Sequence, residues 1–143
     1  WKGVHKRSSK LYNNNLIYSD SGARNIVKYL DANILLGIAV DVQEKGNFHR
    51  THPFDFLGNK LYFQTSAERL AKLSNKKLFS MIIVHDKEKN SHELRISPPM
   101  TPGAPFVATQ SALAFMEPFV ASNPNQMFHN LQRLFAKPHV ASN

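Results

Sequence analysis

Four side chains that could bind a metal ion or move a proton occur close together in the first half of the chain. Asp41 follows an apolar run, His49 and His52 stand three residues apart, and Asp55 comes shortly after them. Histidine nitrogens and carboxylate oxygens are typical zinc ligands. The other interpretation is a polar loop with partly exposed histidines. Arg50 favours the loop because it places a cation beside His49, so we predict no metal at these residues.

Basic residues form a second group that could do chemistry, namely Lys2, Lys6, Arg7, Lys10, Lys45 and Arg50. The formal net charge of the chain is +8. Positive potential attracts nucleic acid, phospholipid head groups or an acidic carrier protein, and the charge alone does not choose among them. A solvated face explains these residues equally well. Lys72, Lys76 and Lys77 surround the expected end of a helix, where cations favour the helix dipole, so we interpret them as structural.

Aromatic residues form a third group beside these cations, namely Phe48, Phe54, Phe56, Tyr62 and Phe63. Such a cluster could line an acyl-chain pocket or touch a bilayer. The alternative is that the rings belong to the hydrophobic core, and we favour the core for Phe56 and Phe63.

Several motifs that carry chemistry are absent from the sequence. There is no P-loop, no G-x-G-x-x-G and no G-x-S-x-G. The chain has no cysteine, which excludes disulfides and cysteine-ligated zinc. None of the seven histidines is followed five residues later by an acidic residue, so the chain contains no His-x4-Asp/Glu dyad.

The elements that must position these residues are expected to alternate between strand and helix. Apolar segments predict strands over residues 16–18, 34–40, 60–64, 78–85 and 92–97, with 34–40 and 78–85 buried on both faces. Helical spacing predicts helices over residues 23–30, from 65 onward, over 109–119 and after 124. Thr65-Ser-Ala-Glu68 is a capping-box sequence, in which hydroxyl and carboxylate each bind a helix N–H. Pro98–Pro105 predicts a rigid, irregular connection.

This order predicts one α/β domain over residues 1–138 with a short tail over 139–143. The continuous apolar strands indicate a mixed, largely parallel sheet flanked by helices. No apolar run reaches the length of about 18 residues that a spanning helix needs, and the chain does not start with a signal-peptide pattern.

Several short segments follow one another in a characteristic order. They are Asn14-Asn-Leu-Ile-Tyr-Ser-Asp20, Leu36-Gly-Ile-Ala-Val-Asp41, His52-Pro-Phe-Asp-Phe-Leu-Gly58, Ala67-Glu-Arg-Leu-Ala71, Leu94-Arg-Ile-Ser-Pro-Pro99 and Asn123-Pro-Asn-Gln-Met-Phe-His129, followed by Arg133-Leu-Phe-Ala-Lys137-Pro138. In this order they resemble the lysophospholipid acyltransferase family, especially its lipid A late-acyltransferase branch. The resemblance covers residues 6–138 and implies a glycerol-phosphate-acyltransferase-like fold that lacks its N-terminal part.

The resemblance implies transfer of a fatty acyl group from acyl carrier protein or acyl-CoA to a lipid hydroxyl. The catalytic His-x4-Asp/Glu dyad would lie upstream of this chain, with the histidine as general base. The chain would supply substrate binding through Lys6, Arg7, Asp41, Lys45, His52, Phe54, Phe56 and Arg133. Lys6 and Arg7 would contact phosphate or pantetheine, Asp41 would brace the site, and Phe54 and Phe56 would line the acyl side. No cofactor other than the acyl donor is implied.

The same resemblance implies a lipid acceptor, a carrier protein or CoA thioester as partner, and the cytoplasmic face of the inner membrane as location. The chain would be peripheral there or anchored by a missing N-terminal segment. We also expect an exposed apolar face where that segment or a partner chain belongs. Two other functions stay open: a non-catalytic acyltransferase-like subunit that binds lipid or carrier protein, and a basic α/β nucleic-acid-binding or nuclease domain. We predict no nucleic-acid partner.

Overall fold

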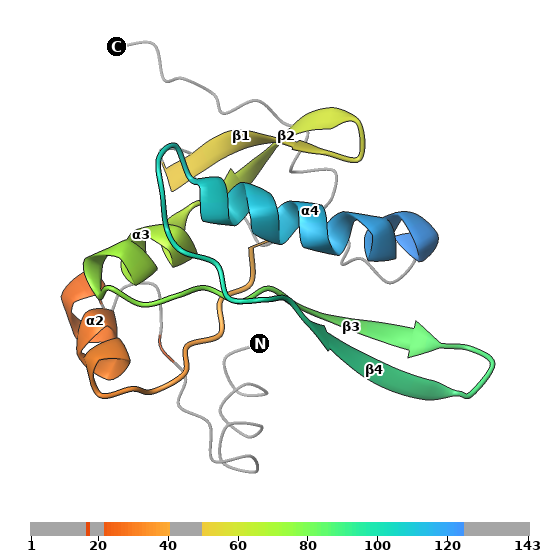
Figure 1. The fold of residues 1–143 in the computed structure, drawn as a ribbon, viewed down its shortest axis with the longest axis horizontal. Helices are drawn as coiled ribbons and strands as arrows, with labels where there is room; N and C mark the ends of the chain where they lie inside the picture. Colours follow the sequence, from red (N-terminus) through yellow and green to blue (C-terminus); the bar gives the residue numbers. More distant parts are fainter. Residues whose placement is uncertain (1–16, 18–21, 41–49, 125–143) are drawn as a thin grey trace. The chain divides into compact units, whose positions relative to one another are not determined.

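The computed structural model describes residues 17, 22–40 and 50–124. The chain divides into two compact units, residues 1–36 and residues 37–143. Figure 1 shows the elements, which are α2 (Ala23–Asp31), β1 (Thr51–Phe56), β2 (Asn59–Gln64), α3 (Ser66–Leu73), β3 (Met81–Asp86), β4 (Ser91–Ile96) and α4 (Val107–Ser122). The single domain predicted over residues 1–138 stays a prediction.

Helix α2 is the described element of the first unit. It begins after Gly22, which has a φ of 74° that glycine adopts without steric cost, and it ends at Asp31 as the sequence predicts. The apolar side chains Ile26, Val27 and Leu30 of α2 are half-buried, and no residue of α2 is fully buried. The sequence contains possible capping side chains at residues 20 and 21, but both lie outside the described residues.

The buried strand predicted over residues 34–40 is wrong. These residues form no strand, and Ile34 and Leu35 leave 45% and 83% of their surface exposed. An apolar run becomes a strand only when a neighbouring strand takes up its backbone hydrogen bonds, and the described residues contain no such neighbour for it. In the strand predicted over residues 16–18, only residue 17 is described, and it lies in no element.

The largely parallel sheet is also wrong for the described residues, which form two separate antiparallel pairs, β1–β2 and β3–β4. Leu57 and Gly58 alone join β1 to β2, with φ angles of 52° and 71°. A turn with two such angles matches strand twist and connects antiparallel neighbours. The turn over residues 87–90 joins β3 to β4, whereas a parallel pair needs a crossover of a dozen or more residues. The predicted α/β class is confirmed, because the described residues form three helices and two antiparallel two-stranded sheets.

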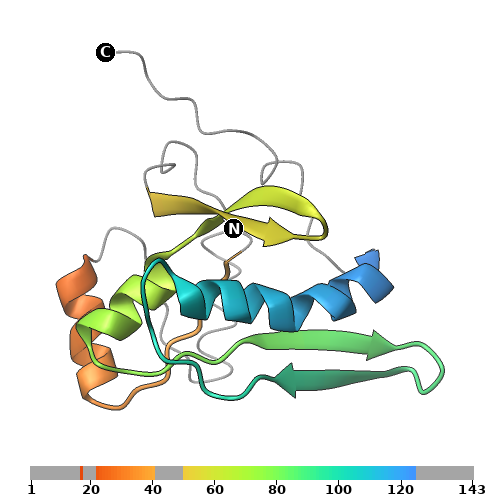
Figure 2. The ribbon, with the colours of Figure 1, turned by 45° about the horizontal axis from the view of Figure 1, so that its top comes forward.

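Helix α4 lies between the two hairpins (Figures 1 and 2), and it contacts β1 on one side and β3 on the other. The core on the β1–β2 side consists of Phe54, Phe56, Leu61, Phe63, Leu113 and Val120, and Ile82 of β3 packs against it. The rings of Phe56 and Phe63 meet edge to face with centroids 5.3 Å apart. Each ring of this size stabilises the fold by about 1.5–3 kcal/mol through burial. The core therefore depends on both hairpins and on α4.

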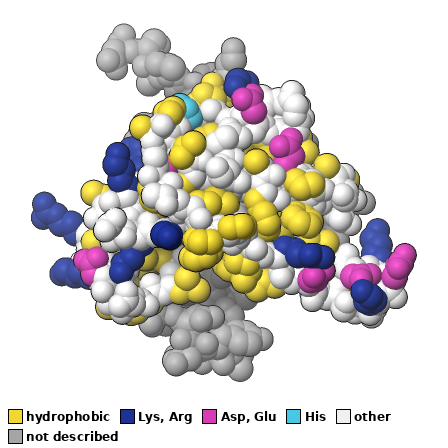
Figure 3. Space-filling view, viewed as in Figure 1, with side chains coloured by type: hydrophobic (Ala, Val, Ile, Leu, Met, Phe, Trp, Pro, Cys, Tyr) yellow, Lys and Arg dark blue, Asp and Glu magenta, His cyan; other side chains and the backbone are white. Residues whose placement is uncertain are grey.

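The strand predicted over residues 78–85 corresponds to β3, and the prediction that it is buried on both faces is wrong. Register pairs Met81 with Ile96 and Ile83 with Leu94, so these four side chains share one face. They are exposed by 48%, 55%, 62% and 54%. We call these four side chains the outer face. Figure 3 shows basic and acidic side chains at the lower right, where Figure 1 places the β3–β4 turn, and hydrophobic side chains nearer the middle of the view. In the described residues, no helix is long and apolar enough to cross a membrane.

Candidate functional site

A buried carboxylate organises the surroundings of the candidate site. Glu68 of α3 is only 2% exposed. Its oxygens accept hydrogen bonds from the backbone N–H of Gly103 (2.9 Å), Ala108 (3.3 Å) and Thr109 (2.8 Å), and from the Thr109 hydroxyl (2.6 Å). Glu68 therefore caps helix α4 and holds the proline-rich connection that leads into it.

This arrangement corrects the capping-box prediction. Thr65 precedes α3, yet its side chain makes no capping bond there, and Glu68 points away to a different helix. The physical reason is the start of α4, where Phe106 occupies the N-cap position and offers no acceptor. The first N–H groups of a helix need acceptors and favour negative charge. A buried carboxylate from α3 meets both needs.

The pKa of Glu68 reflects two opposing effects. Burial by itself raises the pKa, whereas the hydrogen bonds from Thr109, Gly103 and Ala108 lower it. The hydrogen bonds prevail, so the pKa lies below its ordinary value. Glu68 is therefore ionised at neutral pH, with its negative charge directed into α4.

Arg69, next to Glu68 on α3, is fixed at two points. Its Nε donates a hydrogen bond to the Thr65 hydroxyl at 3.0 Å, and its guanidinium carbon lies 5.3 Å from the centroid of the Phe106 ring. Thr65 is itself held, because its hydroxyl donates to the Arg50 carbonyl at 3.0 Å. Stacking and a bond at Nε leave the terminal nitrogens of an arginine available to a ligand.

A small cavity of about 160 Å³ lies beside Arg69. It is lined by Glu68, Arg69, Lys72, Gly103, Ala104, Pro105 and Phe106. Within the part of the chain that the structure describes, Arg69 and Lys72 form no ion pair. Among the described residues these two cations have no ion-pair partner, and the Glu68 carboxylate beside them is bonded to Gly103 and α4, so together with the aromatic ring they are suited to hold a small anion.

His52 is the predicted site residue that the structure brings next to this cavity. Its ring lies 5.2 Å from the ring of Phe106 and 5.1 Å from that of Phe54. Asp55 stands on the opposite face of β1, where its carboxylate pairs with Lys60 at 2.7 Å. His52 and Asp55 therefore do not share a metal site, and the described residues contain no metal-binding group. Asp41 and His49 lie outside the described residues.

Phe54 and Phe56 lie in the core, with exposed fractions of 3% and 1%. The core interpretation is confirmed for Phe56 and for Phe63, which is 1% exposed. The remaining predicted binding residues lie outside the described residues; they are Lys6, Arg7, Asp41, Lys45 and Arg133. Their roles stay predictions.

Sequence reasoning missed Arg69 and assigned Lys72 to the helix dipole. A signal was present, because residues three apart on a helix lie on the same face and these two follow a helix-start motif. What the sequence does not contain is the partner surface. Phe106 and the connection over residues 103–105 complete the cavity, and they lie far away along the chain.

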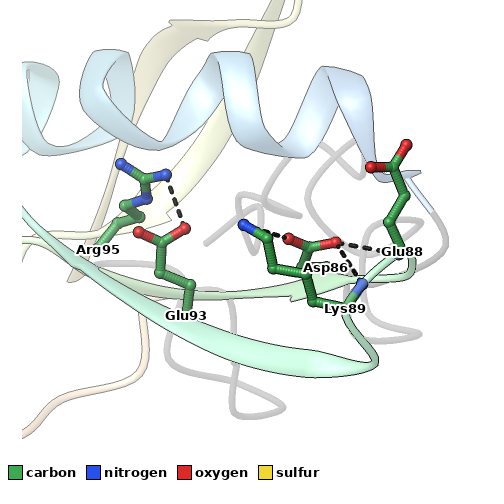
Figure 4. Close-up of polar contacts among 5 residues, drawn as sticks. All are labelled: Asp86, Glu88, Lys89, Glu93 and Arg95. Atoms are coloured by element: carbon green, nitrogen blue, oxygen red, sulfur yellow. Dashed lines mark hydrogen bonds and ion pairs between the residues drawn. The ribbon is translucent and has the colours of Figure 1, made fainter.

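The charges of the β3–β4 hairpin are kept away from its outer face. Glu93 and Arg95 form an ion pair at 2.7 Å (Figure 4), and their register partners place both on the face that includes Ile82. At the turn, Asp86 accepts the backbone N–H of Lys89 (3.1 Å) and of Glu88 (3.0 Å), and these bonds hold the pKa of Asp86 below its ordinary value. The outer face is consequently free of Lys, Arg, Asp and Glu side chains.

No family model, no curated protein and no solved structure matches this chain.

Proposed function

We propose that this chain is the substrate-binding part of an acyltransferase domain. The domain would move a fatty acyl group from acyl carrier protein or acyl-CoA to a lipid hydroxyl, at the cytoplasmic face of the inner membrane. The observation that carries the proposal is the outer face of β3–β4, which is apolar, uncharged and exposed. Exposed apolar patches typically mark interaction sites for proteins, membranes or ligands.

The order of the resembling segments adds support, because three of them coincide with structural units. Residues 52–58 span β1 and its turn, residues 67–71 lie within α3, and residues 94–99 end β4 and begin the proline-rich connection. A glycerol-phosphate-acyltransferase-like architecture for the whole domain is part of this proposal.

Acyl transfer needs a base that removes the proton of the acceptor hydroxyl, so that its oxygen can attack the thioester carbonyl and expel the thiolate. The dyad that the resemblance implies is absent from these 143 residues, so the base would come from outside them. This chain would bind the reactants. Arg69 and Lys72 offer positive charge for a phosphate, as would Lys6 and Arg7, and the outer face offers apolar surface for lipid.

The proposal is tested on the complete natural protein with an acyl-transfer assay. The assay uses acyl carrier protein or CoA thioesters as donors and lysophospholipids or lipid A precursors as acceptors, with vesicle binding measured in parallel. Ile83→Ser combined with Leu94→Ser should reduce binding to vesicles. Leu73→Ser is the matched control, because Leu73 is 68% exposed on α3, outside the outer face.

Each outcome separates the proposal from its alternatives. If the protein binds vesicles but transfers no acyl group from any of the donors, it would be a non-catalytic subunit rather than an enzyme. If the Ile83/Leu94 double variant and the Leu73 control bind vesicles equally well, the outer face does not bind the membrane. Tight binding to DNA or RNA that falls steeply with salt would favour the nucleic-acid alternative instead.

A further inference from the structure

We propose that the cavity beside Arg69 binds the phosphate group of a larger molecule. The site stands on the geometry of α3 and the 103–106 connection, so it does not require the acyl-transfer function. The residues predicted from the sequence to contact phosphate, Lys6 and Arg7, lie outside the described residues.

The charge at the cavity favours an anion. Among the described residues, Glu68 is the only acidic one that lines the cavity, and four hydrogen bonds direct its carboxylate to Gly103 and to the start of α4. Arg69 and Lys72 therefore face the cavity without a carboxylate bonded to either of them among the described residues. A dianionic phosphate matches two such cations better than a singly charged carboxylate does.

The arginine is also held in place before any ligand arrives. Its Nε donates to the Thr65 hydroxyl at 3.0 Å, its guanidinium carbon lies 5.3 Å from the centroid of the Phe106 ring, and Glu68 holds Gly103 of the connection. A fixed side chain loses less conformational freedom on binding, so more of the interaction with the ligand is retained as affinity. Guanidinium groups that are held in this way donate two parallel hydrogen bonds to phosphate oxygens.

The size of the cavity indicates that it takes a group rather than a whole ligand. Its volume of about 160 Å³ is smaller than the roughly 300–1,000 Å³ of typical small-molecule sites. The two cations come from α3, whereas Ala104, Pro105 and Phe106 of the connection supply apolar lining. A phosphate ester fits this division, with its oxygens at Arg69 and Lys72 and its carbon substituent along the Phe106 side.

The test uses the full chain and three probes: inorganic phosphate, CoA, and vesicles of phosphatidylcholine with or without phosphatidic acid. Amide chemical shifts of residues 103–106 should respond to phosphate and much less to acetate at equal concentration. Arg69→Gln should weaken phosphate binding by about tenfold or more, and Lys72→Gln by a smaller factor. Lys87→Gln should leave the affinity for phosphate unchanged, because Lys87 lies at the β3–β4 turn and does not line the cavity.

A thermal melt of each variant shows whether it is folded. If Arg69→Gln does not fold, Lys72→Gln alone tests the site, because Lys72 is exposed on α3 and its replacement should not disturb the fold. Equal phosphate affinity in wild type and both variants, or equal responses to acetate and phosphate, would overturn the site. A response to phosphate and CoA but not to phosphatidic acid assigns the phosphate to a soluble CoA-type donor, and a response to phosphate and phosphatidic acid but not to CoA assigns it to a lipid head group. If the protein shows no acyl transfer but still binds phosphate at these residues, the acyl-transfer proposal is wrong and the phosphate site is still supported.

Discussion

Glu68 and Thr109 lie far apart in the sequence, yet the Thr109 hydroxyl donates a 2.6 Å hydrogen bond to the Glu68 carboxylate. Both residues are buried, with exposed fractions of 2% and 4%. The same carboxylate also accepts the Thr109 backbone N–H at 2.8 Å, so a single side chain of α3 fixes the first turn of α4. This contact joins the helix that carries Arg69 to the helix that lies between the two hairpins.

Replacing Glu68 with Gln should destabilise the fold at neutral pH by about 2–3 kcal/mol, because a buried charged acceptor with four donors is lost. The loss should depend on pH. The folded pKa of Glu68 lies below its unfolded value, so its stabilisation is complete above the unfolded value of about 4.3 and disappears as pH falls through the folded pKa. Urea unfolding between pH 7 and pH 3 should therefore show wild type approaching Glu68→Gln as the solution becomes acidic.

Glu88→Gln is the control for this measurement, because Glu88 is exposed at the β3–β4 turn. It should leave stability within about 0.5 kcal/mol of wild type at every pH. A constant difference between wild type and Glu68→Gln across the whole pH range would show that Glu68 does not titrate with a lowered pKa.

Replacing Gly58 with Ala should cost about 1–2 kcal/mol, because Gly58 has a φ of 71° in the turn between β1 and β2. The loss comes from the backbone and not from crowding, since an added Cβ would meet no atom within 4 Å. Gly37→Ala is the matched control, with equal open space and no positive φ. Thermal unfolding of both variants measures the effect, and equal melting temperatures would contradict this account of the turn.

Replacing Phe56 with Ala should destabilise the fold by about 3–5 kcal/mol, since its ring is 1% exposed and packs on Phe63. Phe79→Ala removes the same ring from a position that is 51% exposed and should cost much less. Denaturant unfolding of the two variants tests whether Phe56 is a core residue. A small cost for Phe56→Ala would instead favour a ring that lines a binding surface.

Two buried serines should contribute unequally at the base of the β3–β4 hairpin. The Ser97 hydroxyl accepts the Ser80 backbone N–H at 2.9 Å and donates to the Pro98 carbonyl, whereas the Ser80 hydroxyl donates to the Ala112 carbonyl at 3.3 Å. Ser97→Ala leaves a buried N–H without its acceptor and should cost about 1–3 kcal/mol. Ser80→Ala should cost about 1 kcal/mol or less. Chemical denaturation ranks the two variants, and the reverse order would contradict the assignment.

The sequence predicts local elements well and their partners poorly. The strand over 60–64, the helix after Thr65 and the strand over 92–97 are confirmed as β2, α3 and β4. Strand β1 was not predicted, because the segment contains Pro53 and ends at Gly58, and proline and glycine are typical of turns. Pro53 is tolerated there because, among the described strands, β1 pairs only with β2, so its other edge needs no backbone donor. The predicted parallel sheet failed because apolar runs do not specify the strand that will pair with them.

The candidate site shows the same division. His52 was identified from its residue type, and the structure places it against Phe106. The role of Glu68 was assigned to the wrong helix, because a capping-box pattern describes only local bonds while α4 lacked a cap of its own. Arg69 is defined by contacts with Thr65 and Phe106, and the second of these comes from folding rather than from spacing along the chain.

The position of α4 between two hairpins sets an order for synthesis of the protein. Both hairpins leave the ribosome before residues 107–122 do, and their strands form no hydrogen bonds with one another. An isolated two-stranded hairpin is at best marginally stable in water. The growing chain therefore carries Phe54, Phe56 and Ile82 without their helical partner until α4 emerges, and during that interval these side chains are the ones a chaperone would meet.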